Sequence, residues 1–354
     1  MVFFPISGAE INILFPIFLG FTVGIVGGFI GVGGGYMVTP ALIIFGVPGN
    51  LAVGTDITHI AGKSVIATIR HRQLGNVDFR LGLIMVVSTM LGVELGVQLI
   101  NHYKEKGLVD VVVLTASLII LLGIGIYTHV ETKKSKKILD QMKKEKKKLP
   151  REIMVSSFAK RVQKLNIPPM IYLKTSRLRI SFWVVFFVGF MTGALAGFFG
   201  VGGGFIRVPA LIYLVGTPTL IAVGTDLFEI IISAGYGSLR HGMSGNVDII
   251  LALTMLLGAT LGAQIGAIAT SYVRGPSVRF VLSWSVFLAL IGSALNLAYV
   301  LTDRSIVYLG LASKGVILAQ MFILVGMIIG LFIVANLARK GYRVPEFLES
   351  MIVK

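Results

Sequence analysis

Gly31-Val32-Gly33-Gly34-Gly35 lies near the start of the chain and returns, letter for letter, as Gly200-Val201-Gly202-Gly203-Gly204. Each run is followed by the same Pro-Ala-Leu-Ile, which begins at Pro40 in the first copy and at Pro209 in the second. A long internal repeat is the strongest indication of the architecture that a sequence can contain. The sequence therefore predicts two copies of one structural unit.

The match extends in both directions from the glycine runs. Residues 52–56 read Ala-Val-Gly-Thr-Asp and recur at 222–226, after one inserted residue in the second copy. Residues 75–78 read Gly-Asn-Val-Asp and recur at 245–248, and an Arg-His pair precedes both turns. These turns read as helix stops, and we assign them no ligand.

The composition indicates a membrane protein. Of the 354 residues 55% are hydrophobic and only 14% are charged, which is typical of a chain with several membrane spans. The formal net charge of +16 is concentrated in one place, because residues 131–179 hold 16 Lys or Arg against four acids. Cytoplasmic retention of this loop explains the charge better than nucleic acid does, so membrane lipid is an expected partner and nucleic acid is not. The chain has 0 Cys, which excludes disulfides and thiolate sites.

The apolar runs predict the fold class: an all-α polytopic membrane protein of two inverted repeats. Each repeat is a broken or re-entrant helix hairpin plus three transmembrane helices, and one extra helix follows at the C-terminus. The second run, 36–47, is too short for the ~20 residues that a span needs, so 11–47 is read as the broken hairpin. The expected units are the first repeat at 1–130, a basic cytoplasmic loop with an amphipathic helix at 131–179, the second repeat at 180–300, and a C-terminal helix and tail at 301–354.

The positive charges also predict the orientation. With the 131–179 loop inside, the N-terminus lies outside and the C-terminal tail is cytoplasmic. No basic n-region or cleavage pattern marks a removable signal peptide, so the first hydrophobic stretch is expected to stay. An odd number of equivalent elements per repeat makes the second repeat enter from the opposite face, and inverted repeats with broken helices are a transporter architecture.

The basic loop begins with a Lys-rich run and continues at 151–165, where apolar residues fall on one helical face opposite basic ones. The first reading is a solvated linker with one helix lying on anionic headgroups. A regulatory or partner-docking role is the alternative.

The glycine runs are the first candidate site. Between two half-helices, glycines let the backbone approach a ligand, and the N–H groups that open the next half-helix favour an anion. Close helix packing through small residues is the alternative, and it is the reading for the flanking Gly20, Gly24 and Gly28. The substrate-contact candidates are Gly31, Gly33, Gly34, Gly35, Gly200, Gly202, Gly203 and Gly204.

The third element of each repeat carries ionisable residues inside a span, where they are costly and point to function. Asp56, His59 and Lys63 share one helical face. His59 and Lys63, with Thr55 and its equivalent Thr225, are candidate substrate contacts. Asp56 and, in the second repeat, Asp226 and Glu229 are candidate proton carriers. The alternative is an Asp56–Lys63 pair that only locks the packing.

Two further positions complete the candidate set. Arg207 stands where the first repeat has the apolar Val38, and its planar guanidinium suits an oxyanion. It could instead pair with Glu229 or Asp226 as a structural lock. Glu94, in the fourth element, is a candidate proton carrier, and pairing across helices is its alternative.

These residues resemble the sulfite exporter TauE/SafE family, also called the toluene-sulfonate uptake permeases. The resemblance rests on the duplicated Gly-x-Gly-Gly-Gly followed by Pro-Ala, the Ala-Val-Gly-Thr start of the third element and the Gly-Asn-Val-Asp turn after a histidine. It covers about 11–129 and 180–300, whereas the loop between them is longer than the family pattern needs. It implies a prokaryotic inner-membrane permease for sulfur-containing oxyanions such as sulfite or organosulfonates, coupled to protons.

The competing readings are an anion channel with the same pore and an intramembrane enzyme. No catalytic constellation, metal-ligand cluster or cofactor motif stands out, so we expect a transporter and no enzyme. The sequence leaves open the exact substrate, the direction of transport, the role of the basic loop and the oligomeric state, including a homodimer.

Overall fold

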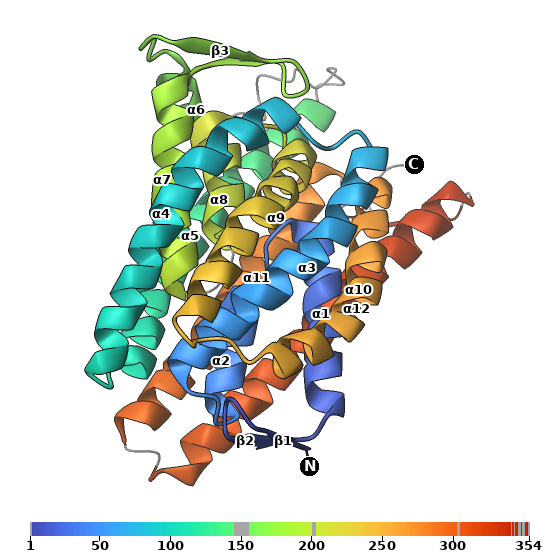
Figure 1. Cartoon of the computed structure of the whole chain (residues 1–354). Helices are drawn as coiled ribbons and strands as arrows, with labels where there is room; N and C mark the ends of the chain where they lie inside the picture. The colour runs from blue at the N-terminus through green and yellow to red at the C-terminus, as the bar shows by residue number, and fades with distance from the viewer. Residues whose placement is uncertain are drawn as a thin grey trace.

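The structure is a computed structural model of the whole chain. It describes residues 2–144, 156–199, 203–302 and 305–340, together with 342, 344, 345, 348, 351 and 352 of the tail. The described part is a helical bundle with two small β-hairpins at its ends (Figure 1). This confirms the all-α polytopic class.

The first half begins with a short hairpin and continues as a broken helix and three long helices. The two strands pair antiparallel and place Phe3 opposite Glu10. The elements are β1 (Val2–Phe4), β2 (Ala9–Ile11), α1 (Leu14–Ile30), α2 (Gly35–Ile44), α3 (Gly49–Gln73), α4 (Phe79–Glu105) and α5 (Val109–Lys144).

The second half repeats this order and adds one helix. A short helix, α6 (Ser157–Gln163), precedes it. Its elements are β3 (Met170–Leu173), β4 (Leu178–Ser181), α7 (Phe182–Phe199), α8 (Gly204–Ala210), the π-helical turn η2 (Leu211–Val215), α9 (Thr219–Met243), α10 (Ile249–Ala269), the 3-10 turn η3 (Thr270–Tyr272), α11 (Gly275–Leu301) and α12 (Val307–Arg339).

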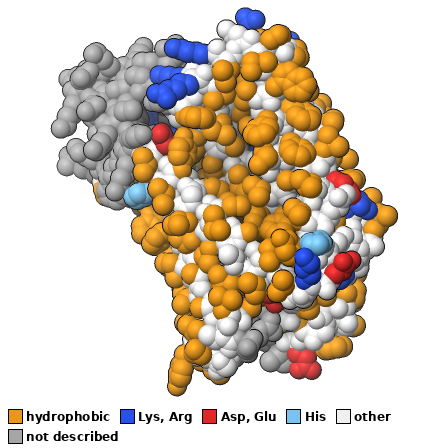
Figure 2. All heavy atoms as spheres, turned by 90° about the vertical axis from the view of Figure 1, so that its left-hand side faces the viewer, with side chains coloured by type: hydrophobic (Ala, Val, Ile, Leu, Met, Phe, Trp, Pro, Cys, Tyr) orange, Lys and Arg blue, Asp and Glu red, His pale blue; other side chains and the backbone are white. Residues whose placement is uncertain are grey.

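Seven helices of the described chain are long and apolar enough to cross a membrane: α4, α5, α7, α9, α10 joined to η3, α11 and α12. With 25 residues, α3 is as long as α9, yet it is not among the seven because its composition is too polar. Lipid solvates the outer faces of such helices, and Figure 2 shows a face covered mainly by hydrophobic side chains. Exposed apolar residues recur at every fourth position, as Leu83, Val87, Leu91 and Leu95 on α4 and Leu253, Leu257, Leu261 and Ile265 on α10.

Each broken helix is interrupted at its glycine run. Gly31 ends α1 with φ 83°, and Gly34 precedes α2 with φ 83°. Gly203 precedes α8 with φ 75° in the same way. Side chains rarely adopt this left-handed conformation, so glycine allows the turn without strain. The predicted broken hairpins are present in both halves.

Glycine also brings helices of opposite halves into backbone contact. α1 packs along α10, and α7 packs along α4. A Cβ atom on Gly24 would lie 2.7 Å from the carbonyl oxygen of Ala259, and one on Gly193 would lie 2.3 Å from that of Thr89. Side chains larger than hydrogen would separate these pairs, so the flanking glycines serve close packing, as the sequence predicts.

The two halves exchange equivalent contacts. The hydroxyl of Thr55 accepts a hydrogen bond from the N–H of Asp248 at 2.9 Å, and that of Thr225 accepts one from the N–H of Asp78 at 2.8 Å. Each aspartate then caps its own helix, α10 or α4. A twofold axis between the repeats would produce this reciprocity.

The hairpins extend the repeat beyond the boundaries that the sequence predicts. Ser7 donates its backbone N–H to Asp248 at 3.1 Å, and Ser176 donates its own to Asp78 at 3.0 Å. β1–β2 and β3–β4 therefore occupy equivalent places, and they lie at opposite ends of the bundle (Figure 1). Residues 170–181 thus belong structurally with the second half, although the sequence pattern placed most of them in the basic loop.

The basic loop differs from its expectation in two further ways. α5 continues as helix to Lys144, well past the predicted boundary at 130. Of the amphipathic helix expected at 151–165, the described chain contains only the seven residues of α6, and 145–155 lie outside the described residues. The end of α6 packs on η2, because the hydroxyl of Ser156 donates to the Tyr213 carbonyl at 2.6 Å.

The glycine contacts give a stability prediction. Replacing Gly96 by alanine should lower the midpoint of thermal unfolding of the purified protein in detergent, because the new Cβ would lie 2.3 Å from the carbonyl oxygen of Ala194 on α7. Overpacking of this kind costs about 1–3 kcal/mol. The control is Gly123→Ala on α5, where a Cβ meets nothing within 4 Å. Equal midpoints for the two variants would contradict the packing argument.

Candidate substrate site

The two glycine runs touch each other inside the bundle. A Cβ atom on Gly204 would lie 2.9 Å from the backbone nitrogen of Gly33 and 2.9 Å from Cα of Val32. The two runs therefore meet in the part of them that is described. Gly200 and Gly202, with Val201 between them, lie outside the described residues.

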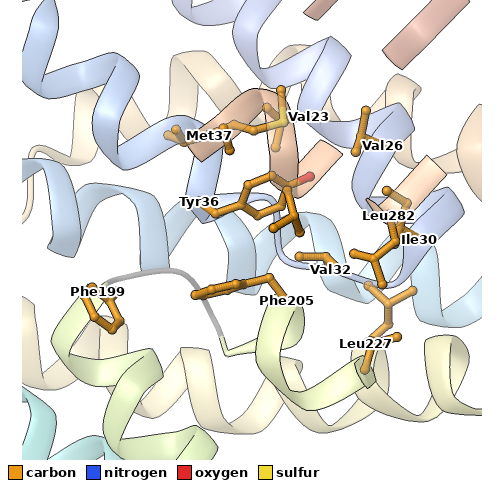
Figure 3. Close-up of a cluster of buried hydrophobic side chains, with 14 of the residues drawn as sticks. Val23, Val26, Ile30, Val32, Tyr36, Met37, Phe199, Phe205, Leu227 and Leu282 are labelled. Atoms are coloured by element: carbon orange, nitrogen blue, oxygen red, sulfur yellow. The ribbon is translucent and has the colours of Figure 1, made fainter. Parts of the chain in front are cut away.

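Hydrophobic side chains from both halves surround this contact. Figure 3 shows Val32 of the first run beside Tyr36 of α2 and Phe205 of α8. Tyr36 and Phe205 hold equivalent positions, and their ring centroids are 5.9 Å apart. Both side chains are buried, and the Tyr36 hydroxyl is hydrogen-bonded to that of Ser285 on α11. The contact is thus closed off by packed side chains.

An ionic cluster of Arg207, Asp226 and Glu229 lies beside the glycine run of the second half. Arg207 on α8 contacts Oδ1 of Asp226 through NH1 at 3.1 Å, and the same nitrogen pairs with Glu229. Its Nε donates to the hydroxyl of Thr192 on α7 at 3.1 Å. Arg207, Asp226 and Glu229 are all fully buried. The alternative predicted for Arg207, pairing with Asp226 or Glu229, is present.

Glu229 ties this cluster to the first half. One of its oxygens accepts a hydrogen bond from Thr89 on α4, and the other accepts one from Ser233 at 3.1 Å. Asp226 points toward the glycine runs, because its Oδ2 would lie 2.6 Å from a Cβ on Gly204.

The first-half cluster is arranged differently. Oδ2 of Asp56 accepts a hydrogen bond from the Thr39 hydroxyl at 3.0 Å, and Thr39 Oγ1 also lies 3.3 Å from the carbonyl of Phe199 at the end of α7. His59 Nδ1 lies 3.5 Å from Oδ1 of Asp56. No hydrogen-bond partner is found for either ring nitrogen of His59 among the described residues.

Lys63 is a buried cation beside the first glycine run. Its Nζ contacts the Val23 carbonyl at a long 3.5 Å and would lie 3.1 Å from a Cβ on Gly34. No described carboxylate lies within 4 Å of it. Asp56 and Lys63, the pair of the sequence alternative, are therefore not in direct contact, although the two groups attract each other electrostatically.

The two cations occupy equivalent places although they come from different helices. Lys63 of α3 lies between Val23 of α1 and Gly34, whereas Arg207 of α8 lies between Thr192 of α7 and Gly203. Gly34 and Gly203 are equivalent in the repeat, as are Val23 and Thr192. Each glycine run consequently has one cation behind it, and both cations are buried.

Several polar atoms around the contact have no protein partner. Among the described residues they are Oδ1 of Asp56, both ring nitrogens of His59, NH2 of Arg207 and Oδ2 of Asp226. Buried polar groups are nearly always hydrogen-bonded. Several unpartnered polar atoms in one place therefore indicate that water, a proton or a ligand is the missing partner. No group of three or more His, Asp or Glu among the described residues is arranged to hold a metal ion.

Comparison with known proteins decides the family. The family model for sulfite exporter TauE/SafE matches residues 16–297, which is most of the chain. The chain belongs to the TauE/SafE family. No solved structure matches it.

Curated relatives agree with this TauE/SafE assignment. "Probable membrane transporter protein YunE" of Bacillus subtilis is 25% identical over 285 residues, which cover 78% of this chain and 94% of the relative. A protein with the description "Probable membrane transporter protein" from Xylella fastidiosa is 26% identical over 255 residues, covering 71% of this chain and 80% of the relative. "Probable membrane transporter protein MJ0441" of Methanocaldococcus jannaschii is 25% identical over 295 residues, covering 77% and 93%. This TauE/SafE chain is thus a multi-pass membrane transporter.

Three of the predicted residues of this TauE/SafE protein have hydrogen-bond partners outside the glycine runs. Thr55 and Thr225 are hydrogen-bonded to the turns before α10 and α4, so both residues have a structural role. Glu94 is 28% exposed and forms two hydrogen bonds with Arg240 of α9, at 2.6 and 2.7 Å. Its sequence alternative, pairing across helices, is what the structure shows.

The residue pattern missed three buried hydroxyls that contact the carboxylates or Arg207: Thr39, Thr89 and Thr192. Comparison of the two TauE/SafE repeats contained a signal for two of them. Thr39 stands where the second repeat has Val208, and Thr192 stands where the first has Val23. A polar residue in only one copy of a buried position marks a side chain with a specific partner.

The Arg207 cluster gives a prediction that separates folding from transport. Arg207→Leu should strongly reduce the yield of folded protein, because it leaves two buried carboxylates without their cation, at a cost of about 3–5 kcal/mol. Size-exclusion chromatography of the purified protein measures that yield.

The matched variant is the triple change Arg207→Leu, Asp226→Asn and Glu229→Gln, which removes the unpaired charges and should restore much of the folded yield. A single Arg207→Leu variant that folds as well as the wild type would show that the carboxylates do not need the guanidinium.

Proposed function

We propose that this TauE/SafE transporter carries a small sulfur-containing oxyanion, such as sulfite or an organosulfonate, with protons through the contact between its two glycine runs. The observation that carries the proposal is the pair of buried cations, Lys63 and Arg207, one behind each run. Two fixed positive charges around a glycine-lined backbone suit a small anion that several donors can surround.

Backbone donors support the same substrate class. The first N–H groups of α2, on Gly35 and Tyr36, have no acceptor among the described residues, since Met37 and Val38 take the Gly34 carbonyl. Helix starts with free N–H groups carry a partial positive charge that favours anions. Arg207 adds an NH2 group that lacks a partner. A trigonal or tetrahedral oxyanion matches this set of donors.

Charge balance supports proton coupling. The described site buries three carboxylates, Asp56, Asp226 and Glu229, against the two cations Lys63 and Arg207. With all five ionised and His59 neutral, the site carries one excess negative charge, and an incoming monoanion adds a second. A buried excess charge is strongly unfavourable. The anion therefore binds best together with protons, on the carboxylates or on His59.

Transport requires this buried site to open alternately to each side. Packed Tyr36 and Phe205 cover the contact in the present conformation. Transporters of this architecture open by movement of one repeat or bundle against the other. The placement of β1–β2 and β3–β4 at opposite ends of the bundle supports an inverted arrangement of the two halves (Figure 1).

Coupling is tested by flux in proteoliposomes. Counterflow of labelled sulfite against a panel of sulfonates should identify the substrate, and an imposed pH gradient should drive wild-type flux. Asp56→Asn, Asp226→Asn and Glu229→Gln should each reduce or abolish the response to the gradient, because an amide cannot release a proton. Glu94→Gln serves as the matched control, since Glu94 lies outside the site and pairs with Arg240. Wild-type flux indifferent to the gradient would overturn coupling and favour the channel reading.

Orientation is part of the proposal. We expect residues 131–179 and the C-terminus in the cytoplasm of a prokaryotic cell and the N-terminus outside its inner membrane, because the basic residues concentrate in that loop and near the tail. Protease added to right-side-out vesicles should leave the loop intact and should cut it after the membrane is permeabilised. Cleavage in sealed vesicles would reverse the orientation.

A further inference from the structure

A cavity lies away from the glycine runs, at the end of the bundle that carries β3–β4. Its volume is about 620 Å³. Its walls come from the Gly75–Asn76 turn, the tip of the β3–β4 hairpin, the linker before α9 and the first turn of α11. The residues that matter here are Arg177, Thr217, Thr219, Leu220 and Arg279.

The equivalent place in the first half shows what this cavity lacks. There α3 begins at Gly49, whose backbone N–H donates to Oδ1 of Asp110 on α5 at 2.8 Å. A carboxylate from the protein thus neutralises the positive end of that helix. The repeat aligns Gly49 with Thr219. Asp110 and Arg279 are equivalent by their contacts, because Asp110 of α5 bonds Gly49 and Arg279 of α11 bonds Thr219. The second half therefore has an arginine where the first has the capping acid.

The start of α9 is consequently positive and uncapped. Its N-cap, Pro218, offers no side-chain hydrogen bond. The N–H groups of Thr219, Leu220 and Ile221 have no acceptor among the described residues. Arg279 is 95% buried, and its Nε donates to the Thr219 hydroxyl at 2.8 Å. Glu131 attracts it from α5, but no described carboxylate lies within 4 Å of its guanidinium.

A second buried polar residue belongs to the wall of the same cavity. Thr217 lines the cavity and is only 2% exposed, and its hydroxyl has no hydrogen-bond partner among the described residues. Its equivalent in the first half is the apolar Val47. The one residue inserted in the second half falls in this stretch and is accommodated by the π-helical turn η2, a form often found at functional sites. At this place the second half thus has a hydroxyl and a cation, whereas the first half has a carboxylate.

We propose that this cavity is a second oxyanion site, held by the start of α9, the Thr217 hydroxyl and the Arg279 guanidinium. Arg177 at the hairpin tip supplies a further positive charge from the opposite wall. An external oxyanion takes the place that the Asp110 carboxylate fills in the first half. The proposal concerns binding alone, so it stands or falls separately from the transport of sulfite. The ligand is a sulfate-like or phosphate-like oxyanion, either the transported one or another from the same compartment.

The absence of native cysteine allows a local test. Leu220→Cys places a single thiol in the cavity wall, and Asn50→Cys places one at the equivalent position of α3, where Asp110 already caps the helix. The rate of labelling by neutral N-ethylmaleimide is measured on purified protein, in sulfate, methanesulfonate or phosphate against gluconate at equal ionic strength.

Saturating oxyanion should slow labelling of the Leu220→Cys variant at least about threefold, as occupancy by a ligand requires, and should leave the Asn50→Cys variant unchanged. Arg279→Gln and Thr217→Val in the Leu220→Cys background should each weaken this protection. Arg279→Asp should abolish it, because it restores the first-half cap. The matched control is Arg274→Gln, an exposed arginine at the start of α11, the helix that carries Arg279, and this variant should keep full protection.

The three anions separate the sources of the ligand. Protection by methanesulfonate alone assigns the site to the proposed transported class of anion, and equal protection by phosphate assigns it to oxyanions in general. Absence of protection, protection that survives both Thr217→Val and the Arg279 changes, or equal protection at Asn50→Cys would overturn the proposal.

Discussion

The contact between the two glycine runs is the constraint on which the rest of this structure depends. A helix that breaks within a membrane exposes N–H and C=O groups that lipid cannot satisfy. Here each break lies against the other, with Gly204 on the backbone of Gly33, so neither faces lipid. The glycine seams of α1 with α10 and of α7 with α4 hold the two breaks at this distance. Loss of either seam would expose both breaks.

Because the breaks are enclosed, ionic groups can be placed behind them. Arg207 is tolerated since Asp226 and Glu229 pair with it, and Lys63 is surrounded by backbone rather than by a carboxylate. The two halves thus share one backbone plan and differ in how they balance charge. A bound anion would meet a strongly paired cation on one side and a weakly paired one on the other.

Much of this architecture can be predicted from the sequence, because glycine and proline are the residues that recur in the repeat. Their effects on the backbone are local. The broken helices, the long helices and the enclosed Asp56, Asp226 and Arg207 follow from the repeat. The β-hairpins do not, since they keep only a few letters in common, such as Ser7 and Ser176. The contacts of Thr55 and Glu94 are also not predicted, because they depend on which residues of the other half lie opposite these side chains. The contact of Arg279 with the start of α9 is not predicted either, because its meaning comes from comparison with Asp110 at the equivalent place.

The placement of Lys63 and Arg207 on different helices has an energetic consequence. In a transporter whose repeats were identical, the two end states would be related by symmetry and would have equal free energies. Lys63 moves with α3, whereas Arg207 moves with the short helix α8, so exchanging the conformations of the two halves does not reproduce the same set of ionic contacts. Without the symmetry-imposed equality, the two end states of the empty protein need not have equal populations.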